Sequence, residues 1–312
     1  MSRPAPPAVI VLVGPTGVGK TDVGFHLAAS LGAEIVSADS RLVYRLMDIG
    51  TAKPGPAITG RVPHHMIDIV APDRQFTAKE FERGARSAID RILAGGKPAV
   101  VVGGTGLYVR ALLRGIFDGP AADPAVRRRL GEEARRRGVG ALWEDLLRVD
   151  PDKARQVHST NLTRIVRALE VHELTGKRMS DLEKQARPIG WACVQVGLTR
   201  ERQELYRRID QRVDEMFQSG FVDEVRRLAG SGYAGGPVVT KTLGYTEVLR
   251  HLDGEIALEE AIRLVKTNTR NFAKRQITWF KREADIVWVD LTGRADYQAV
   301  ASEIRESLDR LP

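Results

Sequence analysis

The stretch "AVIVLVGPTGVGKT", residues 8–21, determines the fold expected of this 312-residue chain. It begins with a continuous apolar, β-branched run that ends at Gly14, which is typical of a strand buried on both faces. The part "GPTGVGKT", residues 14–21, then matches the pattern G-x-x-x-x-G-K-[ST] of a phosphate-binding loop. The residues after it have the apolar spacing of a helix. The motif therefore has the context that such a loop requires, with a strand before it and a helix after it.

The motif predicts a site for a di- or triphosphate, because backbone N–H groups and a helix N-terminus can surround the anion. Lys20 would neutralise the outer phosphate, and the Thr21 hydroxyl would bind Mg²⁺. A glycine-rich turn without a ligand is the alternative, which the flanking strand and helix disfavour. The predicted diphosphate-binding residues are Gly14, Pro15, Thr16, Gly17, Val18, Gly19, Lys20 and Thr21.

The surrounding sequence alternates between strands and helices. "AEIVSAD" (33–39) predicts a second strand, and "TAKEFERGARSAIDRILAGGK" (77–97) predicts an amphipathic helix that leads into a third buried strand, "PAVVVGG" (98–104). A further strand is expected at "WACVQVGLT" (191–199). This alternation predicts an α/β fold, with a parallel sheet around the phosphate loop and helices on both of its faces.

The stretch between residues 118 and 190 has a different character. It is helical, polar and very basic, and it contains no buried strand. We therefore predict two domains, an α/β catalytic core formed by residues 1–117 and 191–312, and an inserted all-helical subdomain formed by residues 118–190.

The overall composition favours a polyanionic partner. The chain has 48 Lys and Arg residues against 40 Asp and Glu residues, a net charge of +8, and its pI is near 9.7. The single cysteine, Cys193, cannot form an internal disulfide, so a reducing compartment is expected. No apolar run reaches the roughly eighteen residues that span a bilayer, and the proline-rich start lacks a signal-peptide apolar region. We therefore expect a cytoplasmic protein without a membrane partner.

Asp39 directly follows the second predicted strand. Ligands of open α/β sheets bind at the carboxyl ends of the strands, so this carboxylate should face the same crevice as the phosphate loop. It could bind Mg²⁺, hold a ribose, activate a nucleophile, or cap a helix that begins after Ser40. The third strand ends in "VVVGGTGLY" and lacks the acid that supports Mg²⁺ in many NTP-hydrolysing proteins. Its glycines would permit close approach of the backbone to a ligand, or simply form a turn.

Basic residues gather in two places. On the helix predicted in "EEAIRLVKTNTRNFAKRQITWFKRE", five of them fall on one narrow stripe, namely Arg263, Lys266, Arg270, Lys274 and Lys281. The opposite side, expected to be buried, carries Ala261, Val265, Phe272 and Trp279. A second cluster, in the insertion, contains Arg127, Arg128, Arg129, Arg135, Arg136 and Arg137. Such surfaces fit a nucleic acid bound over the crevice, although a solvated charged face is the usual explanation for a helix of this kind.

A zinc site is not expected. The chain has one cysteine, and His64 and His65 are adjacent rather than at the spacing of zinc ligands. The segment "PHHMID" is therefore interpreted as structural.

The chain resembles tRNA dimethylallyltransferases (tRNA isopentenylpyrophosphate transferases) along nearly its full length. The motifs that carry the resemblance occur in the family's order: "GPTGVGKT", "SADSRLVYRLMDIGTAKP", "PHHMIDI", "VVGGTGLYVRALLRG", "ADPAVR", "TRIVRALEVHELTGK", "RRIDQRVDEMFQSGFVDEVRRL", "KTLGY" and "AKRQITWFKR". The resemblance implies transfer of a dimethylallyl group from dimethylallyl diphosphate to the N6 amine of the adenosine on the 3′ side of the tRNA anticodon (position 37). The phosphate loop would then bind the diphosphate of an isoprenoid, with Mg²⁺ as cofactor.

The resemblance also implies roles for individual residues. Asp39 would take a proton from the adenine amine, Arg212 would contact the diphosphate, and Thr105 would lie near the reacting adenosine. The residues that match tRNA-contacting positions are Asp39, Ser40, Arg41, Leu42, Thr105, Arg127, Thr163, Arg164, Ile165, Val166, Arg167, Lys241, Gly244, Tyr245, Lys274, Arg275, Gln276, Trp279 and Lys281.

Three other functions share parts of this pattern. A free-adenylate isopentenyltransferase would carry out the same transfer on a small acceptor, and a small-molecule kinase would use Asp39 to activate a hydroxyl toward ATP. A nucleotide-switched RNA-binding protein would perform no transfer. The helical insertion and the basic stripe favour tRNA as the acceptor. The sequence has no zinc-finger extension after the core, which is typical of bacterial family members, and we expect a monomer.

Overall fold

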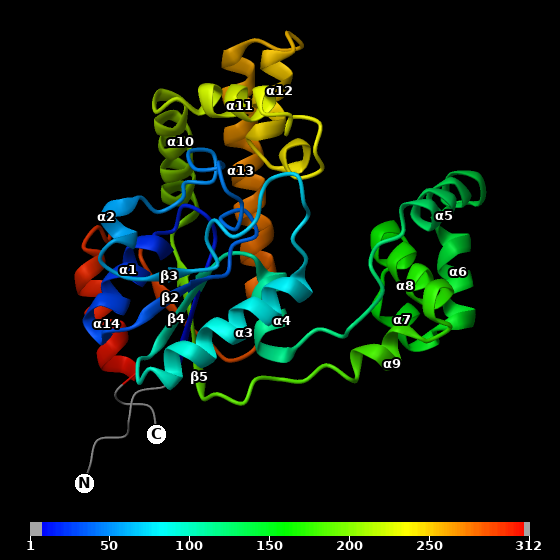
Figure 1. The fold of residues 1–312 in the computed structure, drawn as a ribbon, viewed down its shortest axis with the longest axis horizontal. Helices are drawn as coiled ribbons and strands as arrows, with labels where there is room; N and C mark the ends of the chain where they lie inside the picture. Colours follow the sequence, from blue (N-terminus) through cyan, green and yellow to red (C-terminus); the bar gives the residue numbers. More distant parts are fainter. Residues whose placement is uncertain (1–7, 309–312) are drawn as a thin grey trace. The chain divides into compact units, whose positions relative to one another are not determined.

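The computed structural model describes residues 8–308. They form two compact units (Figure 1). The larger unit contains the described residues up to Leu112 and those from Gly190 onward, and the smaller unit is Leu113–Ile189. The smaller unit therefore begins at Leu113 rather than at residue 118 and ends at Ile189 rather than at residue 190.

The larger unit contains a six-stranded sheet in the order β3-β2-β4-β1-β5-β6, in which every neighbouring pair is parallel. The predicted α/β class is confirmed. The strands are β1 (Val9–Val13), β2 (Glu34–Ser37), β3 (His64–His65), β4 (Ala99–Gly103), β5 (Cys193–Thr199) and β6 (Ile286–Asp290).

Two of these strands were not predicted, and both lie at an edge of the sheet. The strand β3 has only two residues. In β6, Val287 and Trp288 are exposed, so the strand lacks the continuous buried run that identified β1. An edge strand has a neighbour on one side only, and its hydrophobic pattern is correspondingly weak.

The central strand β1 is completely buried. Successive side chains of a strand point to opposite faces of its sheet. Ile10 and Leu12 accordingly pack in one core with Leu27 of the first helix and Val300 of the last. A strand buried on both faces must be apolar at every position, which explains the unbroken run "VIVLV".

Helices cover both faces of the sheet, and a further group of helices lies beyond it, in the upper part of Figure 1. The long helix α13 of this group packs against both α10 and α12. The helices of the larger unit are α1 (Lys20–Leu31), α2 (Pro56–Thr59), α3 (Ala78–Ala94), α4 (Gly106–Arg114, which extends into the smaller unit), α10 (Arg202–Gln218), α11 (Phe221–Gly230), the short 3₁₀ turn η1 (Val239–Lys241), α12 (Tyr245–Leu252), α13 (Leu258–Phe280) and α14 (Tyr297–Leu308).

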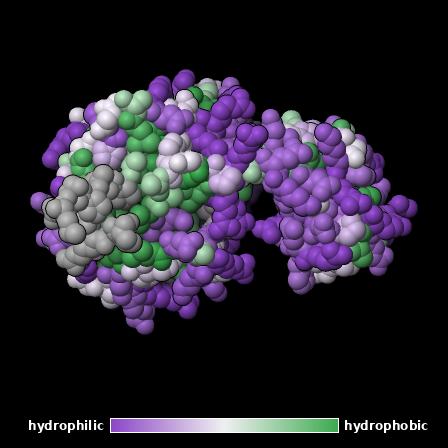
Figure 2. Space-filling view, turned by 90° about the horizontal axis from the view of Figure 1, so that it is seen from below, coloured by the Kyte–Doolittle hydropathy of each residue, from purple (hydrophilic) through white to green (hydrophobic). Residues whose placement is uncertain are grey.

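The smaller unit is helical and has its own core, in which Leu142, Leu146 and Ile165 are fully buried. Its helices are α5 (Pro124–Arg137), α6 (Val139–Val149), α7 (Pro151–Gln156), α8 (Leu162–Thr175) and α9 (Met179–Glu183). In the view of Figure 2 the surface of this unit is almost entirely hydrophilic, whereas the larger unit also displays hydrophobic areas. Among residues 8–308, no helix combines the length and the apolar character needed to cross a membrane.

Candidate active site

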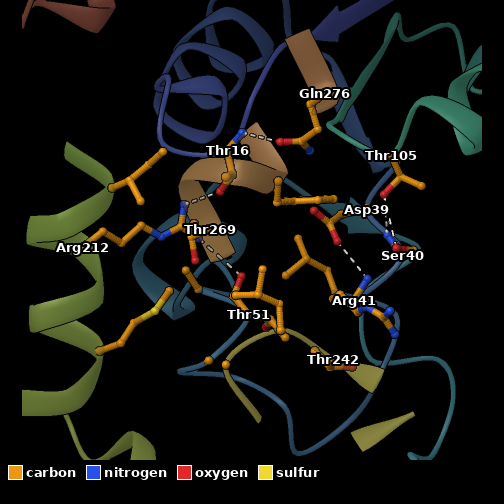
Figure 3. Close-up of a pocket in the computed structure, with 18 of the residues that line it drawn as sticks. Thr16, Asp39, Ser40, Arg41, Thr51, Thr105, Arg212, Thr242, Thr269 and Gln276 are labelled. Atoms are coloured by element: carbon orange, nitrogen blue, oxygen red, sulfur yellow. Dashed lines mark hydrogen bonds between the residues drawn. The ribbon is translucent and has the colours of Figure 1, made fainter. Parts of the chain in front are cut away.

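A cavity of about 390 Å³ lies at the carboxyl ends of β1, β2 and β4. Figure 3 shows Arg212 reaching into it from α10 on one side, while Asp39 and Thr105 lie on the other. Its wall brings together predicted residues from distant parts of the chain, namely Thr16, Lys20, Thr21, Asp39, Ser40, Arg41, Leu42, Thr105, Arg212, Lys241, Gly244, Arg275 and Gln276.

The phosphate loop opens helix α1 without a side-chain cap. Its N-terminal N–H groups are therefore available to an anion, as in other helix N-termini that bind phosphate. Gly19 precedes the helix with a φ of 112°, a left-handed conformation that favours glycine. The Lys20 ammonium donates to the carbonyl of Pro15 at 2.7 Å, so it lies folded over the loop, on the wall of the cavity.

Burial lowers the pKa of Lys20 to about 8. The nearby carboxylate of Asp39 opposes this shift, and the guanidinium of Arg212 adds to it. A diphosphate next to the ammonium would favour the charged form and reverse the effect of burial. The charged form of Lys20 is therefore stabilised when an anion binds to the loop.

Arg212 completes the cationic part of the wall. Its guanidinium donates to the Thr16 hydroxyl and to the Thr51 carbonyl, both at 3.5 Å. Burial lowers its pKa as well, and the attraction of Asp39 opposes the shift. Two half-buried cations, Lys20 and Arg212, therefore stand beside the phosphate loop.

Asp39 does not cap a helix, because a turn follows it and the next helix begins only at Pro56. Its Oδ1 atom accepts the backbone N–H of Arg41 at 2.8 Å. Beside it, the Thr105 hydroxyl accepts the N–H of Ser40 at 3.0 Å and donates to the Ser40 hydroxyl at 3.3 Å. These bonds fix the ends of β2 and β4 against each other and leave the Asp39 carboxylate on the cavity wall.

Gln276 connects the phosphate loop to the residue that follows β4. Its side-chain oxygen accepts the N–H of Thr16 and its amide donates to the carbonyl of Gly104, each at 2.8 Å. The residue is only 6% exposed. Both polar atoms of its amide are used inside the protein, but the residue lines the cavity, and its contact with tRNA stays a prediction.

Gly104 and Gly106, which follow β4, allow helix α13 to pack closely against this part of the chain. A Cβ atom on Gly104 would lie 2.3 Å from the Gln276 amide nitrogen, and one on Gly106 would lie 2.2 Å from the ring nitrogen of Trp279. At these two glycines the space is taken by side chains of α13, whereas Gly103 borders the cavity. Trp279, predicted to contact tRNA, is half-buried at this contact.

The basic stripe of α13 divides into two halves. Lys266 and Arg270 form ion pairs with Asp214 and Asp210 of α10, each at 2.7 Å, and Arg263 pairs with Glu260 of its own helix. The helix sequence alone does not reveal the acids of α10. Towards the C-terminal end, Lys274 and Lys281 are exposed, and no ion pair of theirs occurs within residues 8–308.

The opposite side of α13 was predicted to be buried. Ala261 and Val265 are buried, but Phe272 is 38% exposed and borders the cavity. A separate shallow groove of about 370 Å³ follows the exposed part of the helix, lined by Asn271, Lys274, Arg275, Thr278, Trp279 and Arg282. Asn271, Thr278 and Arg282 of this groove were not among the predicted residues.

Some predicted tRNA-contacting residues face inward. Ile165 is fully buried in the core of the smaller unit, and Val166 packs against that core. Tyr245 is fully buried, and Gly244 is also buried. These predictions treated whole motif segments as surface, whereas successive residues of a helix point in different directions.

The other predicted residues of these segments are accessible. Thr163, Arg164 and Lys241 are exposed. Arg127 and Arg167 are partly exposed, and both pair with the fully buried carboxylate of Glu170, at 2.8 and 2.6 Å. That carboxylate neutralises part of their charge.

The residues near the phosphate loop fit a Mg²⁺ ion with few protein ligands. Thr21 borders both the cavity and a second one of about 410 Å³, where Asp22 also lies. The part of the chain that the structure describes contains no group of three or more His, Cys, Asp or Glu side chains suited to a metal. Hydroxyl and carboxylate oxygens are the donors that Mg²⁺ prefers, and it usually keeps waters and phosphate oxygens as its other ligands.

The histidines of "PHHMID" have the structural role that was expected. His64 and His65 form strand β3. The ring of His64 contacts the Val62 carbonyl at 2.7 Å, and that of His65 contacts the Glu34 carboxylate at 2.8 Å. Both contacts hold the edge of the sheet.

Comparison with known proteins identifies the family. The model of the family "IPP transferase" matches residues 42–283. A tRNA dimethylallyltransferase of Thermotoga petrophila is 46% identical over 97% of both chains, and tRNA dimethylallyltransferase 2 of Geotalea uraniireducens is 46% identical over 90% of this chain and 92% of that protein.

Solved structures agree with this assignment. The full-length tRNA isopentenylpyrophosphate transferase of Bacillus halodurans aligns with a TM-score of 0.71 and 38% identity, over 96% of each chain. A eukaryotic dimethylallyltransferase acting on tRNA aligns with a TM-score of 0.80 and 28% identity, over 95% of this chain and 77% of that one. The chain belongs to the IPP transferase family, the family of the tRNA dimethylallyltransferases.

Proposed function

We propose that this protein transfers a dimethylallyl group from dimethylallyl diphosphate to the N6 amine of the adenosine on the 3′ side of the anticodon in tRNA. One observation carries the proposal. A single cavity combines a phosphate loop and two cations, Lys20 and Arg212, with the carboxylate of Asp39. Transfer of a prenyl group from a diphosphate to an amine needs both parts, one for the leaving group and one for the proton.

The donor half binds the diphosphate. The N-terminal N–H groups of α1, Lys20 and Arg212 surround the anion, and the charge that develops on it is neutralised in place. The dimethylallyl group lies along apolar side chains on the same wall, Val213 and Met216 of α10 and Val265 of α13. The Thr21 hydroxyl, with Asp22 nearby, would hold Mg²⁺. When bound, this ion supplies further positive charge to the diphosphate.

The acceptor half activates the adenine amine, a poor nucleophile because its lone pair is delocalised into the ring. The N6 atom forms a bond to the first carbon of the dimethylallyl group while the bond from that carbon to oxygen breaks. The electron pair of the broken bond leaves on the diphosphate, and a proton of N6 passes to Asp39 as general base. Thr105, hydrogen bonded to Ser40, borders the place of the adenosine.

Exposed basic residues of each unit would bind the tRNA backbone. In the larger unit these are Lys274, Arg275 and Lys281 on and after α13, with Lys241 at the cavity. In the smaller unit they are Arg127 and Arg164. Phosphate contacts of this kind position a nucleic acid without reading its sequence. We further propose a monomer in the cytoplasm, and the single cysteine, Cys193, supports the reducing compartment.

Incubation with labelled donors tests the proposal. Dimethylallyl diphosphate labelled in the prenyl group, or ATP labelled in the γ-phosphate, is offered with tRNA, with AMP, or alone. We expect label to enter tRNA from the prenyl donor only. Label in AMP would indicate a free-adenylate isopentenyltransferase, label from ATP would indicate a kinase, and nucleotide binding without any transfer would indicate a switch.

The affinity for the diphosphate should fall as the pH rises through about 8. Lys20 has a pKa of about 8 in the free protein, and a bound diphosphate raises that pKa by stabilising the ammonium. Binding therefore takes up a proton above about pH 8. It is strongest below that pH and weakens by up to tenfold per unit above it.

Titration with dimethylallyl diphosphate and Mg²⁺ from about pH 7 to about pH 9.5 measures this dependence, a range set by the pKa of Lys20. The variant Lys20→Arg, whose guanidinium stays charged, is the control and corrects for ionisation of the ligand itself. Equal pH profiles for wild type and Lys20→Arg would contradict the assignment.

The double variant Lys274→Ala/Lys281→Ala should weaken tRNA binding and lower its logarithmic salt slope by about 1 to 2, because two phosphate contacts are lost. The double variant Arg263→Ala/Lys266→Ala is the matched control from the same helix, since both of its residues are already paired with acids. Filter binding at several salt concentrations measures the slopes. Equal changes in the two double variants would show that the free and the paired halves of the stripe do not differ in tRNA binding.

A further inference from the structure

A buried carboxylate outside the cavity connects two parts of its wall. Glu224 of α11 is 3% exposed. Its Oε2 atom accepts the N–H groups of Asp48 and Ile49 at 2.9 and 2.6 Å. Its Oε1 atom accepts the N–H of Gly50 at 3.1 Å and the Tyr245 hydroxyl at 2.6 Å. Both oxygens are thus used, with three successive N–H groups of one loop as donors.

The loop that Glu224 holds reaches the donor site. Gly50, Thr51 and Ala52 border the cavity, and Ala52 also borders the second cavity beside the phosphate loop. The carbonyl of Thr51 accepts a hydrogen bond from Arg212. The same guanidinium contacts Thr16 of the phosphate loop. The loop therefore contributes one of the two contacts that place the charge of Arg212.

The other donor to Glu224, Tyr245, belongs to a different wall. It is the first residue of α12 and follows the segment 241–244, which borders the cavity. Tyr245 is fully buried, and its ring packs edge-on against Phe221 with centroids 5.0 Å apart. One carboxylate thereby ties the loop on the donor side to the segment 241–244.

A neutral side chain of the same shape cannot replace this arrangement. Glutamine offers one acceptor oxygen and one NH₂ donor, so at least one loop N–H would face another donor. Buried donors without an acceptor are costly, and the loop would move to find other partners.

We propose that Glu224 is a positioning residue for the transfer reaction, which acts through the 48–52 loop and the Thr51 carbonyl to place Arg212 for diphosphate binding. The inference deepens the proposed function and rests on it. Glu224 itself does not line the cavity, so it acts through the residues that it holds, and Arg212 is the link to the diphosphate.

Binding of inorganic pyrophosphate with Mg²⁺, measured by calorimetry, tests the role without requiring transfer. We expect Glu224→Gln to weaken this binding about tenfold, the effect of a displaced charge contact. Binding of tRNA should weaken less than binding of pyrophosphate, because only Lys241 lies near the segment that Glu224 holds and the exposed basic residues of α13 and of the smaller unit are untouched. In the transfer assay, kcat/KM for dimethylallyl diphosphate should fall while the KM for tRNA is unchanged.

The matched control is Asp150→Asn in the smaller unit. Asp150 is 1% exposed and accepts hydrogen bonds from Lys153 and from both donors of Ser180. Asp150→Asn shows the general effect of removing a buried carboxylate, and it should leave the affinity for pyrophosphate unchanged. Glu224→Asp, which keeps the charge but shortens the side chain, should weaken pyrophosphate binding less than Glu224→Gln, and it carries the test if the glutamine variant does not fold.

Wild-type pyrophosphate affinity in a folded Glu224 variant would overturn the inference. So would an equal loss of pyrophosphate and tRNA binding, which indicates a purely structural role. Neither result depends on prenyl transfer. A failure of the proposed function would instead appear as wild-type protein that binds pyrophosphate but transfers no prenyl group.

Discussion

Replacing Asp39 by alanine is expected to lower the rate of prenyl transfer by a factor of about 10² or more, the contribution typical of a general base. Binding of tRNA should remain close to normal, because the basic residues of α13 and of the smaller unit are unaffected. Asp39 borders the cavity beside Thr105 and opposite Arg212. Single-turnover transfer and filter binding of the same variant separate the two quantities.

Asp39→Asn is the decisive control. An asparagine can still accept the N–H of Arg41, as Asp39 does at 2.8 Å, so the turn after β2 is preserved. It cannot take a proton from the amine. Transfer at a normal rate by Asp39→Asn would reduce Asp39 to a residue that shapes the turn.

Replacing Arg212 by alanine should lower the transfer rate by a factor of about 10² to 10³, the usual loss when one preorganised donor to a developing charge is removed. The leaving diphosphate gains negative charge as its bond to carbon breaks, and Arg212 stands between the phosphate loop and the Thr51 carbonyl. The measurements are steady-state rates and pyrophosphate affinity.

Two variants make this result specific. Arg207→Ala removes an exposed arginine from the same helix and should leave the rate nearly unchanged. Arg212→Lys keeps a positive charge but loses the planar pair of donors, so it should recover only part of the activity. Full activity in Arg212→Ala would contradict the assigned role in diphosphate binding.

The parts of the site that the sequence predicted depend on local patterns and one topological rule. The phosphate loop is continuous in the chain, and its strand and helix are adjacent to it. Asp39 and Thr105 follow buried strands, and parallel strands place their carboxyl ends at the same edge of the sheet. The cavity does bring these residues together with Arg212.

The sequence does not reveal contacts between distant segments. Gln276 lies with Ala273 and Phe280 on the buried face of α13, at the three- and four-residue spacing of a helix, and the sequence does not show that its amide binds Thr16 and Gly104. The sequence of α13 likewise does not reveal that acids of α10 neutralise Lys266 and Arg270.

The role of Glu224 could not be read from the sequence either. Its carboxylate contacts a loop that lies about 175 positions earlier in the chain. Only the folded chain shows that three N–H groups of this loop converge on one buried side chain. The spacing of Phe221, Val225 and Leu228 does place Glu224 on the buried face of α11, but it does not reveal which groups the carboxylate binds.

The central claim is that the adenine amine of tRNA receives the prenyl group with Asp39 as base. The most direct test digests tRNA to nucleosides after reaction with dimethylallyl diphosphate and Mg²⁺, and identifies the products by mass spectrometry, with Asp39→Asn in parallel. The account predicts N6-isopentenyladenosine from the position on the 3′ side of the anticodon with the wild-type protein, and almost none with Asp39→Asn. Unmodified tRNA with the wild-type protein, or equal yields from both proteins, would contradict it.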